Sequence, residues 1–407
     1  MTTSTLPVIG AAALDRRPRF IHAFILLVTS SLTVLVTAIL GPSLPAMQAH
    51  FAGTPGVEFM VPLTMTAPML MMAALSVVAG TLADRVGRKR LLVWATALYA
   101  IFGTAPLWLD SLTAILASRI ALGVMEAVLM TISTTLIGDY YTGAQREKLV
   151  SLQTTVAAFS ALVFNALGGV IAEQGWRAPY TVYAISLLLA PLMAFYLWEP
   201  STKGASLQTR LLADGDVVFQ PRRLLGLCLL AVPTGIVFLT VSVHFGYLFG
   251  AIGIKSPALI GTAYAFNAAG KIAGTLLFGW VLASRLPVAW QLATSLVVTA
   301  GGFIWLRFAG DYNGLVAAGA LSGLGVGLLL PTMVTWAMRG LPLSRRGFGM
   351  GAFNSCMFLG HFVNPIIVVG LAKSLGDSRA AAIGDIGFVL VALAAVVAVV
   401  QLRSRRS

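Results

Sequence analysis

Long apolar segments alternate with short polar ones along almost the whole chain. A bilayer core about 30 Å thick is crossed by roughly 20 apolar residues of helix, at about 1.5 Å per residue. Twelve segments meet this requirement, at 22–44, 58–80, 91–109, 112–138, 149–172, 178–198, 224–248, 257–282, 289–308, 314–338, 348–371 and 383–402. The pattern therefore predicts an all-α membrane protein with twelve transmembrane helices.

The longest break in hydrophobicity is the polar stretch 199–223, and it divides the helices six and six. We predict a cytoplasmic tail at 1–21, an N-terminal six-helix bundle at 22–198, a cytoplasmic linker at 199–223, a C-terminal six-helix bundle at 224–402 and a second tail at 403–407. A weak repeat supports the division, because Leu82, Ala83 and Arg85 match Leu282, Ala283 and Arg285 at a constant offset. Parallel halves with a site between them are one known transporter plan.

The composition makes lipid the solvent of this chain. The 407 residues are 58% hydrophobic and only 10% charged, whereas soluble proteins carry about 25% charged residues. The formal net charge is +13, but the basic residues form short clusters between apolar segments and no continuous basic face. This pattern argues against nucleic acid as a partner.

The basic clusters fall in alternate loops, which sets the orientation. They comprise Arg16, Arg17 and Arg19; Arg85, Arg88, Lys89 and Arg90; Arg146 and Lys148; Arg285; Arg339, Arg345 and Arg346; and Arg403, Arg405 and Arg406. By the positive-inside rule both termini are cytoplasmic. The first twenty residues hold no long apolar run and are interpreted as a tail, not a cleaved signal peptide. No Asn-x-Ser/Thr site occurs, which suits a bacterial cytoplasmic membrane.

The segment 80–90 reads Gly-Thr-Leu-Ala-Asp-Arg-Val-Gly-Arg-Lys-Arg. It resembles the Gly-x-x-x-Asp-Arg-x-Gly-Arg-Arg/Lys signature of the major facilitator superfamily, in the expected place between helices two and three. The resemblance implies the major facilitator fold and a gating role for Gly80, Asp84, Arg85, Gly87, Arg88 and Lys89. The glycines permit a tight turn and close helix contact, and Asp84 can accept charge-assisted hydrogen bonds or sit against a helix N-terminus. The alternative is a set of topology-determining charges on a solvated loop.

Two further segments resemble the twelve-helix drug:proton antiporter branch of that superfamily. They are 41–51, at the end of the first helix, and 119–127, with the element Arg-x-x-x-Gly. The signature of the branch in helix five, Gly-x-x-x-Gly-Pro-x-x-Gly-Gly, is mostly replaced. The aligned positions are Ser160, Phe164, Asn165, Gly168 and Gly169, so that only the final glycine pair is retained.

Arg119 and Glu126 are ionisable residues within the predicted fourth helix. Ions at the bilayer centre are costly and usually face a cavity or a partner. The two residues share a helix face but lie about 10 Å apart along the axis, which is too far for a direct pair. Glu126 is a candidate proton carrier, and the alternative is a structural charge network.

Lys271 lies within the predicted eighth helix, one turn after Asn267. Organic-anion carriers of the superfamily have a basic residue at a similar place, and this resemblance implies contact with an anionic substrate group. The alternatives are a counter-ion for Glu126 or a lysine that extends to the interface.

Further cavity candidates are Asn165, His244, Asn354 and His361; Asn354 and His361 are seven residues apart on one helix face. A histidine can titrate near physiological pH, but a plain hydrogen-bonded role is the alternative for each. Cys228 and Cys356 lie in apolar segments and are interpreted as small buried hydrophobes.

The sequence thus predicts a monomeric secondary transporter that moves a small organic solute by alternating access, with protons as the drive. Efflux is the first hypothesis, and uptake or exchange of an organic anion is the second. A non-transporting receptor is the alternative of another class. We expect no enzymatic activity, metal or cofactor, since the sequence holds no metal-ligand cluster, no catalytic constellation and no phosphate-binding Gly-x-x-x-x-Gly-Lys-Ser/Thr loop.

Overall fold

The computed structural model describes residues 18–200, 221–339, 346–376 and 378–404. Within these ranges the chain is helical and contains no strand. Twelve helical segments of the described residues are long and apolar enough to cross a membrane, one for each predicted range. The prediction of an all-α, twelve-helix membrane protein is therefore confirmed.

The elements of the first half are α1 (Phe20–Ala38), η1 (Gly41–Ser43), α2 (Leu44–His50), α3 (Val57–Val86), α4 (Arg88–Thr104), η2 (Ala105–Leu107), α5 (Leu112–Tyr140), α6 (Gly143–Ala172), η3 (Ala178–Ala184) and α7 (Ile185–Tyr196). Those of the second half are α9 (Pro221–Ala251), α10 (Pro257–Leu277), η4 (Phe278–Leu282), α11 (Ala283–Arg285), α12 (Val288–Phe308), α13 (Tyr312–Arg339), α14 (Arg346–Ser374) and α15 (Arg379–Ser404). Most of the predicted linker, 201–220, lies outside the described residues, and its last three residues, 221–223, belong to α9.

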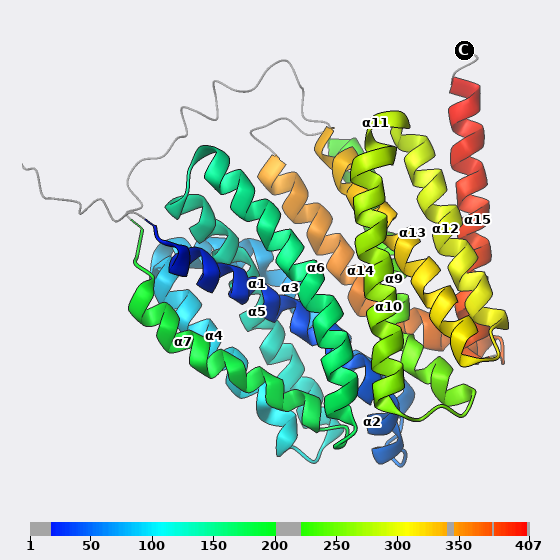
Figure 1. The fold of residues 1–407 in the computed structure, drawn as a ribbon, viewed down its shortest axis with the longest axis horizontal. Helices are drawn as coiled ribbons and strands as arrows, with labels where there is room; N and C mark the ends of the chain where they lie inside the picture. The colour runs from blue at the N-terminus through cyan, green and yellow to red at the C-terminus, as the bar shows by residue number, and fades with distance from the viewer. Residues whose placement is uncertain (1–17, 201–220, 340–345, 377, 405–407) are drawn as a thin grey trace, which may run out of the picture.

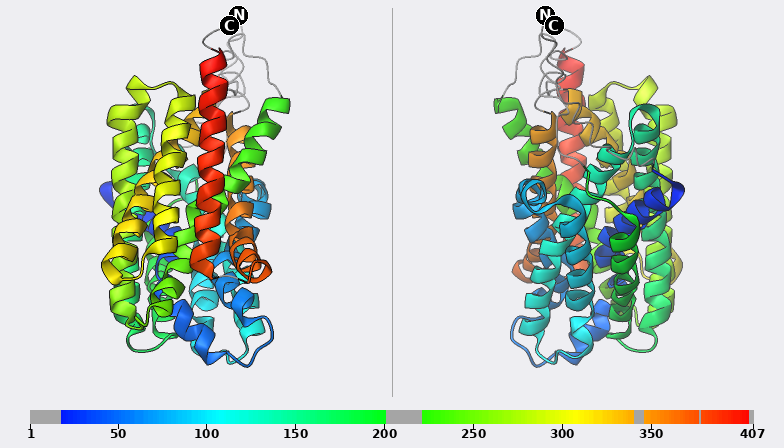
Figure 2. Two further views of the ribbon diagram at one scale, coloured as in Figure 1. Left: turned by 90° about the vertical axis from the view of Figure 1, so that its right-hand side faces the viewer. Right: turned by 90° about the vertical axis from the view of Figure 1, so that its left-hand side faces the viewer.

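The bundle has two ends, which we name by the elements found there (Figure 2). At the linker face α7 and α15 end and α9 begins. The distal face is the opposite end, and it carries the short helix α2. Because the helices alternate in direction, the segment between α3 and α4 lies at the linker face.

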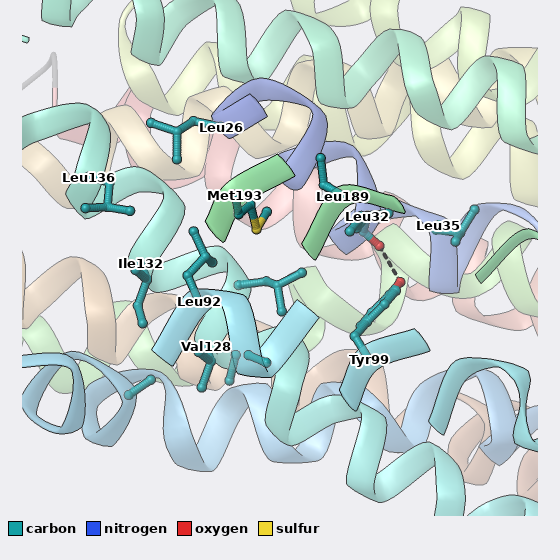
Figure 3. Packing of buried hydrophobic residues seen from close by; sticks show 14 of the residues in the cluster. Leu26, Leu32, Leu35, Leu92, Tyr99, Val128, Ile132, Leu136, Leu189 and Met193 are labelled. Atoms are coloured by element: carbon teal, nitrogen blue, oxygen red, sulfur yellow. Dashed lines mark hydrogen bonds between the residues drawn. The ribbon is translucent and has the colours of Figure 1, made fainter. Parts of the chain in front are cut away.

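Each half has its own apolar core. In the first half, side chains of α1, α4, α5 and α7 pack together, and the Tyr99 hydroxyl donates to the Leu32 carbonyl at 2.7 Å (Figure 3). The second core is built mainly from α9, α12, α13, α14 and α15. A third cluster joins the halves near the distal face, where Met47, Val61 and Leu112 pack with Leu239 and Val243 of α9.

The halves also meet through two pairs of helices. α6 and α10 converge toward the distal face (Figure 1), where a Cβ added to Gly169 would lie 2.5 Å from the Pro257 carbonyl oxygen. α3 and α14 form the other contact, at which the Thr66 hydroxyl reaches the Phe362 carbonyl at 3.5 Å. The retained glycine Gly169 thus allows close packing between the halves.

Several helices extend beyond the predicted ends. α3 was expected to end at Gly80 but continues to Val86, so the first part of the signature is helix and not loop. The turn is made at Gly87, whose φ of 103° is a conformation that favours glycine. The first predicted span, 22–44, extends to His50 in the structure. It is divided after Ala38 into α1, η1 and α2, where Pro42 and Pro45 lack the backbone donors of a continuous helix.

Candidate functional site

The N-terminus of α4 is capped by a carboxylate from the end of the first half. Glu199 accepts hydrogen bonds from the backbone N–H groups of Arg88, at 2.5 Å, and Lys89, at 3.0 Å. These are the first two residues of α4, whose N–H groups have no partner within the helix. A Cβ at Gly87 would lie 3.1 Å from the Glu199 carboxylate, so this glycine provides room as well as the turn.

The other signature residues lie around this cap. Arg88 forms an ion pair with Asp139 of α5. Arg85 is exposed, and Gly80 faces Thr131 at ordinary contact distance. The side chain of Asp84 lies outside the described residues, so its predicted gating contacts stay a prediction.

Sequence reasoning missed Glu199, which it assigned to the polar linker. The available signal was an uncapped helix start, because Gly87 offers no side-chain acceptor to α4. The same segment is held by α5: the Tyr140 hydroxyl donates to the Trp198 carbonyl at 2.5 Å, and the two rings stack with centroids 4.0 Å apart. His22 of α1 packs edge-on against Trp198.

Arg119 is fully buried inside the first half. Its guanidinium donates to the carbonyl oxygens of Phe102 and Gly103, the latter at 3.0 Å. It also lies over the rings of Tyr180 and Tyr183, with its Cζ 5.1 and 5.4 Å from the centroids. The side chain therefore braces α4 and η3 against α5.

Glu126 lies two turns further along α5 and is also fully buried. Neither carboxylate oxygen has a hydrogen-bond partner among the described residues. Arg119, Tyr99 and Tyr183 are its electrostatic neighbours, but no ion pair joins Glu126 to Arg119, in agreement with their predicted separation. Glu126 is therefore an acid buried in the membrane without a fixed partner.

Lys271 and His361 both contact the ring of Phe238, and the three residues come from three different helices. The Lys271 ammonium is 4.8 Å from the Phe238 ring centroid and donates to the Ser242 hydroxyl at 3.1 Å. The His361 ring stacks on Phe238 at 5.4 Å, and its nitrogens have no described partner. Phe358 lies against His361 and belongs to the core of the first half. This cluster, Lys271–Phe238–His361, therefore adjoins the boundary between the halves.

The structure does not place Asn267 beside Lys271's amine. The Asn267 amide donates to the Gly319 carbonyl of α13 at 2.7 Å, within the packing of the second half. The Asn165 amide bonds within α6, to Ala161 at 2.6 Å, close to the α6–α10 contact.

The remaining candidates lie on α9 and α14. His244 is fully buried and both of its nitrogens lack a partner among the described residues. Its neighbour Asn364 donates to the Ile236 carbonyl at 2.8 Å and the Thr240 hydroxyl at 2.9 Å. Asn354 is half-buried, two turns before His361.

Polar contacts join the halves at the distal face. Glu173, just after α6, accepts from the Ser256 hydroxyl at 2.6 Å and from the Ala258 N–H at 3.0 Å, at the start of α10. The bonds from Ser256 and then Ala258 lower the pKa of Glu173 below its usual value of 4.5. Glu58 of α3 pairs with Lys373 of α14, and Arg379 of α15 donates to the Gln48 amide oxygen at 3.2 Å.

No group of three His, Cys, Asp or Glu side chains in the described part of the chain is placed to hold a metal ion.

Comparisons with known proteins identify the family. The profile of the Major Facilitator Superfamily matches residues 26–254 and 223–407. The chain is 22% identical to YdgK of Bacillus subtilis, an uncharacterised MFS-type transporter, over 86% of this chain and 87% of that protein. It is 24% identical to the quinolone resistance protein NorA of Staphylococcus aureus, over 72% of this chain and 75% of that protein. It is 26% identical to the 3-(3-hydroxy-phenyl)propionate transporter of Escherichia coli, over 61% and 62%.

Solved structures share the fold. A D-xylose–proton symporter superposes with a TM-score of 0.75 at 15% identity, covering 93% of this chain and 97% of the symporter. An inward-facing, occupied bacterial homologue of the human lysosomal transporter Spinster gives 0.74 at 14% identity, covering 94% and 96%. The predicted major facilitator fold is confirmed, and the chain belongs to the Major Facilitator Superfamily.

Proposed function

We propose that this transporter exports a small organic solute in exchange for protons, by alternating access, across a bacterial cytoplasmic membrane. In this proposal the linker face and both termini are cytoplasmic, as the basic loops predict, and the distal face is external. The protein works as a monomer of two six-helix bundles joined by the polar linker.

The main support for this proposal is that the Glu126 carboxylate is fully buried and has no hydrogen-bond partner among the described residues. An ionised carboxylate buried without a partner costs several kcal/mol, so in the described conformation the group is stable only with its proton. A conformation that admits water or a basic partner removes that cost and releases the proton. Binding and release in different conformations is what coupling to a proton gradient needs.

Similar proteins support export. NorA is named for quinolone resistance, and LfrA of Mycolicibacterium smegmatis, 28% identical over 45% of this chain and 36% of its own length, is named a multidrug efflux pump. The segments 41–51 and 119–127 point to the same branch.

Glu126→Gln tests the coupling. In proteoliposomes with an imposed pH gradient and ethidium as a fluorescent amphiphilic probe, we expect the wild type to accumulate the probe. Glu126→Gln should lose gradient-driven accumulation but retain exchange of probe across the membrane without a gradient. Glu147→Gln, a change of an exposed carboxylate on α6, is the matched control. Undiminished gradient-driven accumulation by Glu126→Gln would exclude Glu126 as the proton carrier.

A second candidate function is uptake or exchange of an aromatic organic anion, and the Lys271–Phe238–His361 cluster favours it. No described carboxylate pairs with Lys271, so its charge is available to an anionic substrate, and Phe238 and Phe358 offer ring faces beside it. The Escherichia coli relative is named for the transport of an aromatic acid.

Lys271 variants separate the two functions. With 3-phenylpropionate as the probe, we expect Lys271→Ala to abolish uptake and Lys271→Arg to retain part of it, because a cation remains. If 3-phenylpropionate transport by Lys271→Ala equals that of the wild type, the cluster is not an anion site. Ethidium export that survives Lys271→Ala assigns Lys271 to the second function alone.

A further inference from the structure

The contact between α9 and α14 keeps one register over several turns. Both helices run from the linker face to the distal face. The Asn364 amide donates to the Ile236 carbonyl, 128 residues earlier, at 2.8 Å. One turn closer to the linker face, a Cβ added to Gly360 would lie 2.1 Å from the Val232 carbonyl oxygen. Residues of α14 and α9 that are 128 positions apart therefore face each other. One turn nearer the linker face, this spacing pairs Cys356 with Cys228.

Glycine allows the two backbones to approach closely beside this pair. A Cβ at Gly235 would lie 2.1 Å from the Met357 carbonyl oxygen and 3.2 Å from the Gly360 Cα. Helices in such contact can place facing Cα atoms about 4.4–6.8 Å apart, the range that a disulfide spans.

The side chains of Cys228 and Cys356 lie at this close contact. Cys228 and Cys356 are both free thiols, and they interact with each other across the contact. Both are half-buried, so a small reagent can reach them. A single cysteine in an apolar segment behaves as a small hydrophobe, but two thiols that face each other from different helices form a bidentate group.

We propose that Cys228 and Cys356 form a dithiol site, which a two-electron oxidant closes to a disulfide and which a trivalent arsenical bridges. With a diazene such as diamide, the N=N bond accepts two electrons and two protons and becomes a hydrazine while the S–S bond forms. With phenylarsine oxide, two As–S bonds form and the two thiol protons leave with the oxygen as water. Either product ties α9 to α14, and both helices contact the first half.

The natural chain suits the test, because these are its only two cysteines. The purified full-length protein is treated with diamide in detergent, denatured and labelled with a polyethylene-glycol maleimide. We expect two adducts without diamide, none on the monomer band after diamide, and two again after dithiothreitol. Cys228→Ser and Cys356→Ser should each keep one adduct under all three conditions.

The matched control keeps two thiols but breaks the register. Leu359 is exposed on α14, three residues from Cys356, so the variant Cys356→Ser with Leu359→Cys should retain two adducts after diamide. Phenylarsine oxide should protect both thiols of the wild type from maleimide and neither thiol of this variant. Two adducts on the wild-type monomer after diamide, or equal loss from the out-of-register variant, would overturn the proposal.

Discussion

At the scale of single residues, Arg119 shows how a buried ion is held in this membrane protein. The carbonyl groups of Phe102 and Gly103 lie near the C-terminus of α4, where the last carbonyls have no partner within the helix. The guanidinium supplies the missing donors and covers two tyrosine rings. Its role is therefore to stabilise the contact of α4, α5 and η3.

Arg119→Ala should destabilise the protein by about 2–4 kcal/mol, because two buried carbonyls lose a charged donor. Arg119→Lys should be intermediate, since an ammonium cannot reproduce the planar fork. Thermal unfolding in detergent measures both, with Lys148→Ala, a change of an exposed cation on α6, as the control. A wild-type melting temperature for Arg119→Ala would contradict the bracing role.

The sequence alone predicted that Arg119 and Glu126 do not pair, because both lie on one helix and the helical rise fixes their separation. It could not predict their surroundings. The carbonyls that bind Arg119 belong to α4, and Phe238, which joins Lys271 to His361, belongs to α9. Such contacts depend on the packing of helices that are distant in the chain.

At the scale of elements, hydrophobic length predicted every span, since a helix that crosses hydrocarbon must be apolar over about 20 residues. The same criterion does not fix where a helix ends in water. α3 extends through polar residues until Gly87, and α6 begins at Gly143, before the charged residues 146–148. Caps such as Glu199 on α4 come from a segment that is distant in the chain, and they leave no periodic signal.

The contact of Glu173 with the start of α10 should depend on pH. The hydrogen bonds from Ser256 and Ala258 lower the pKa of Glu173 below 4.5. The contact therefore stabilises fully above pH 4.5, and this stabilisation is lost as the pH falls through the lowered pKa. Spin labels at Gln174→Cys and Lys255→Cys, in a background lacking the natural cysteines, report the separation of α6 and α10. We expect one short distance at neutral pH and a longer population that appears only as the pH falls below 4.5.

Glu173→Gln should show the longer population already at neutral pH, and its distances should not change with acid. The neighbouring Lys255 is exposed and is replaced by the spin label both with and without Glu173→Gln. A difference in distance between these two proteins therefore reports the Glu173 carboxylate alone. Acid-dependent distances that persist in Glu173→Gln would assign the effect to another group.

Gly169→Ala should weaken the same helix contact by about 1–3 kcal/mol, because the added methyl would meet the Pro257 carbonyl oxygen at 2.5 Å. The spin-label pair should report a longer α6–α10 distance at neutral pH. Gly279→Ala is the control, since no atom lies within 4 Å of a Cβ at that glycine. Unchanged distances in Gly169→Ala would mean that this close approach does not hold the halves together.

At the scale of the whole molecule, the halves are held at the distal face by several weak contacts. These are the apolar cluster around Met47 and Leu239, the Glu173 contact, and the pair of Glu58 with Lys373. An exposed ion pair contributes about 0–1 kcal/mol, so the pair of Glu58 with Lys373 does not hold the face closed by itself. The proposed alternating access requires closed and open conformations within a few kcal/mol of each other, and a sum of small terms at this face would meet that requirement.

Removing Glu58 or Lys373 should therefore shift the balance between conformations without unfolding the protein. We expect Glu58→Gln and Lys373→Gln each to raise the population open at the distal face by up to about fivefold. The double variant should be no more open than the single ones, because either change alone already breaks the pair. The rate of maleimide labelling at Met65→Cys, a position buried in the distal cluster, measures that population in a background without the natural cysteines. Strictly additive effects in the double variant would show that the two charges act separately, and distal closure would then rest on the apolar cluster and the α6–α10 contact.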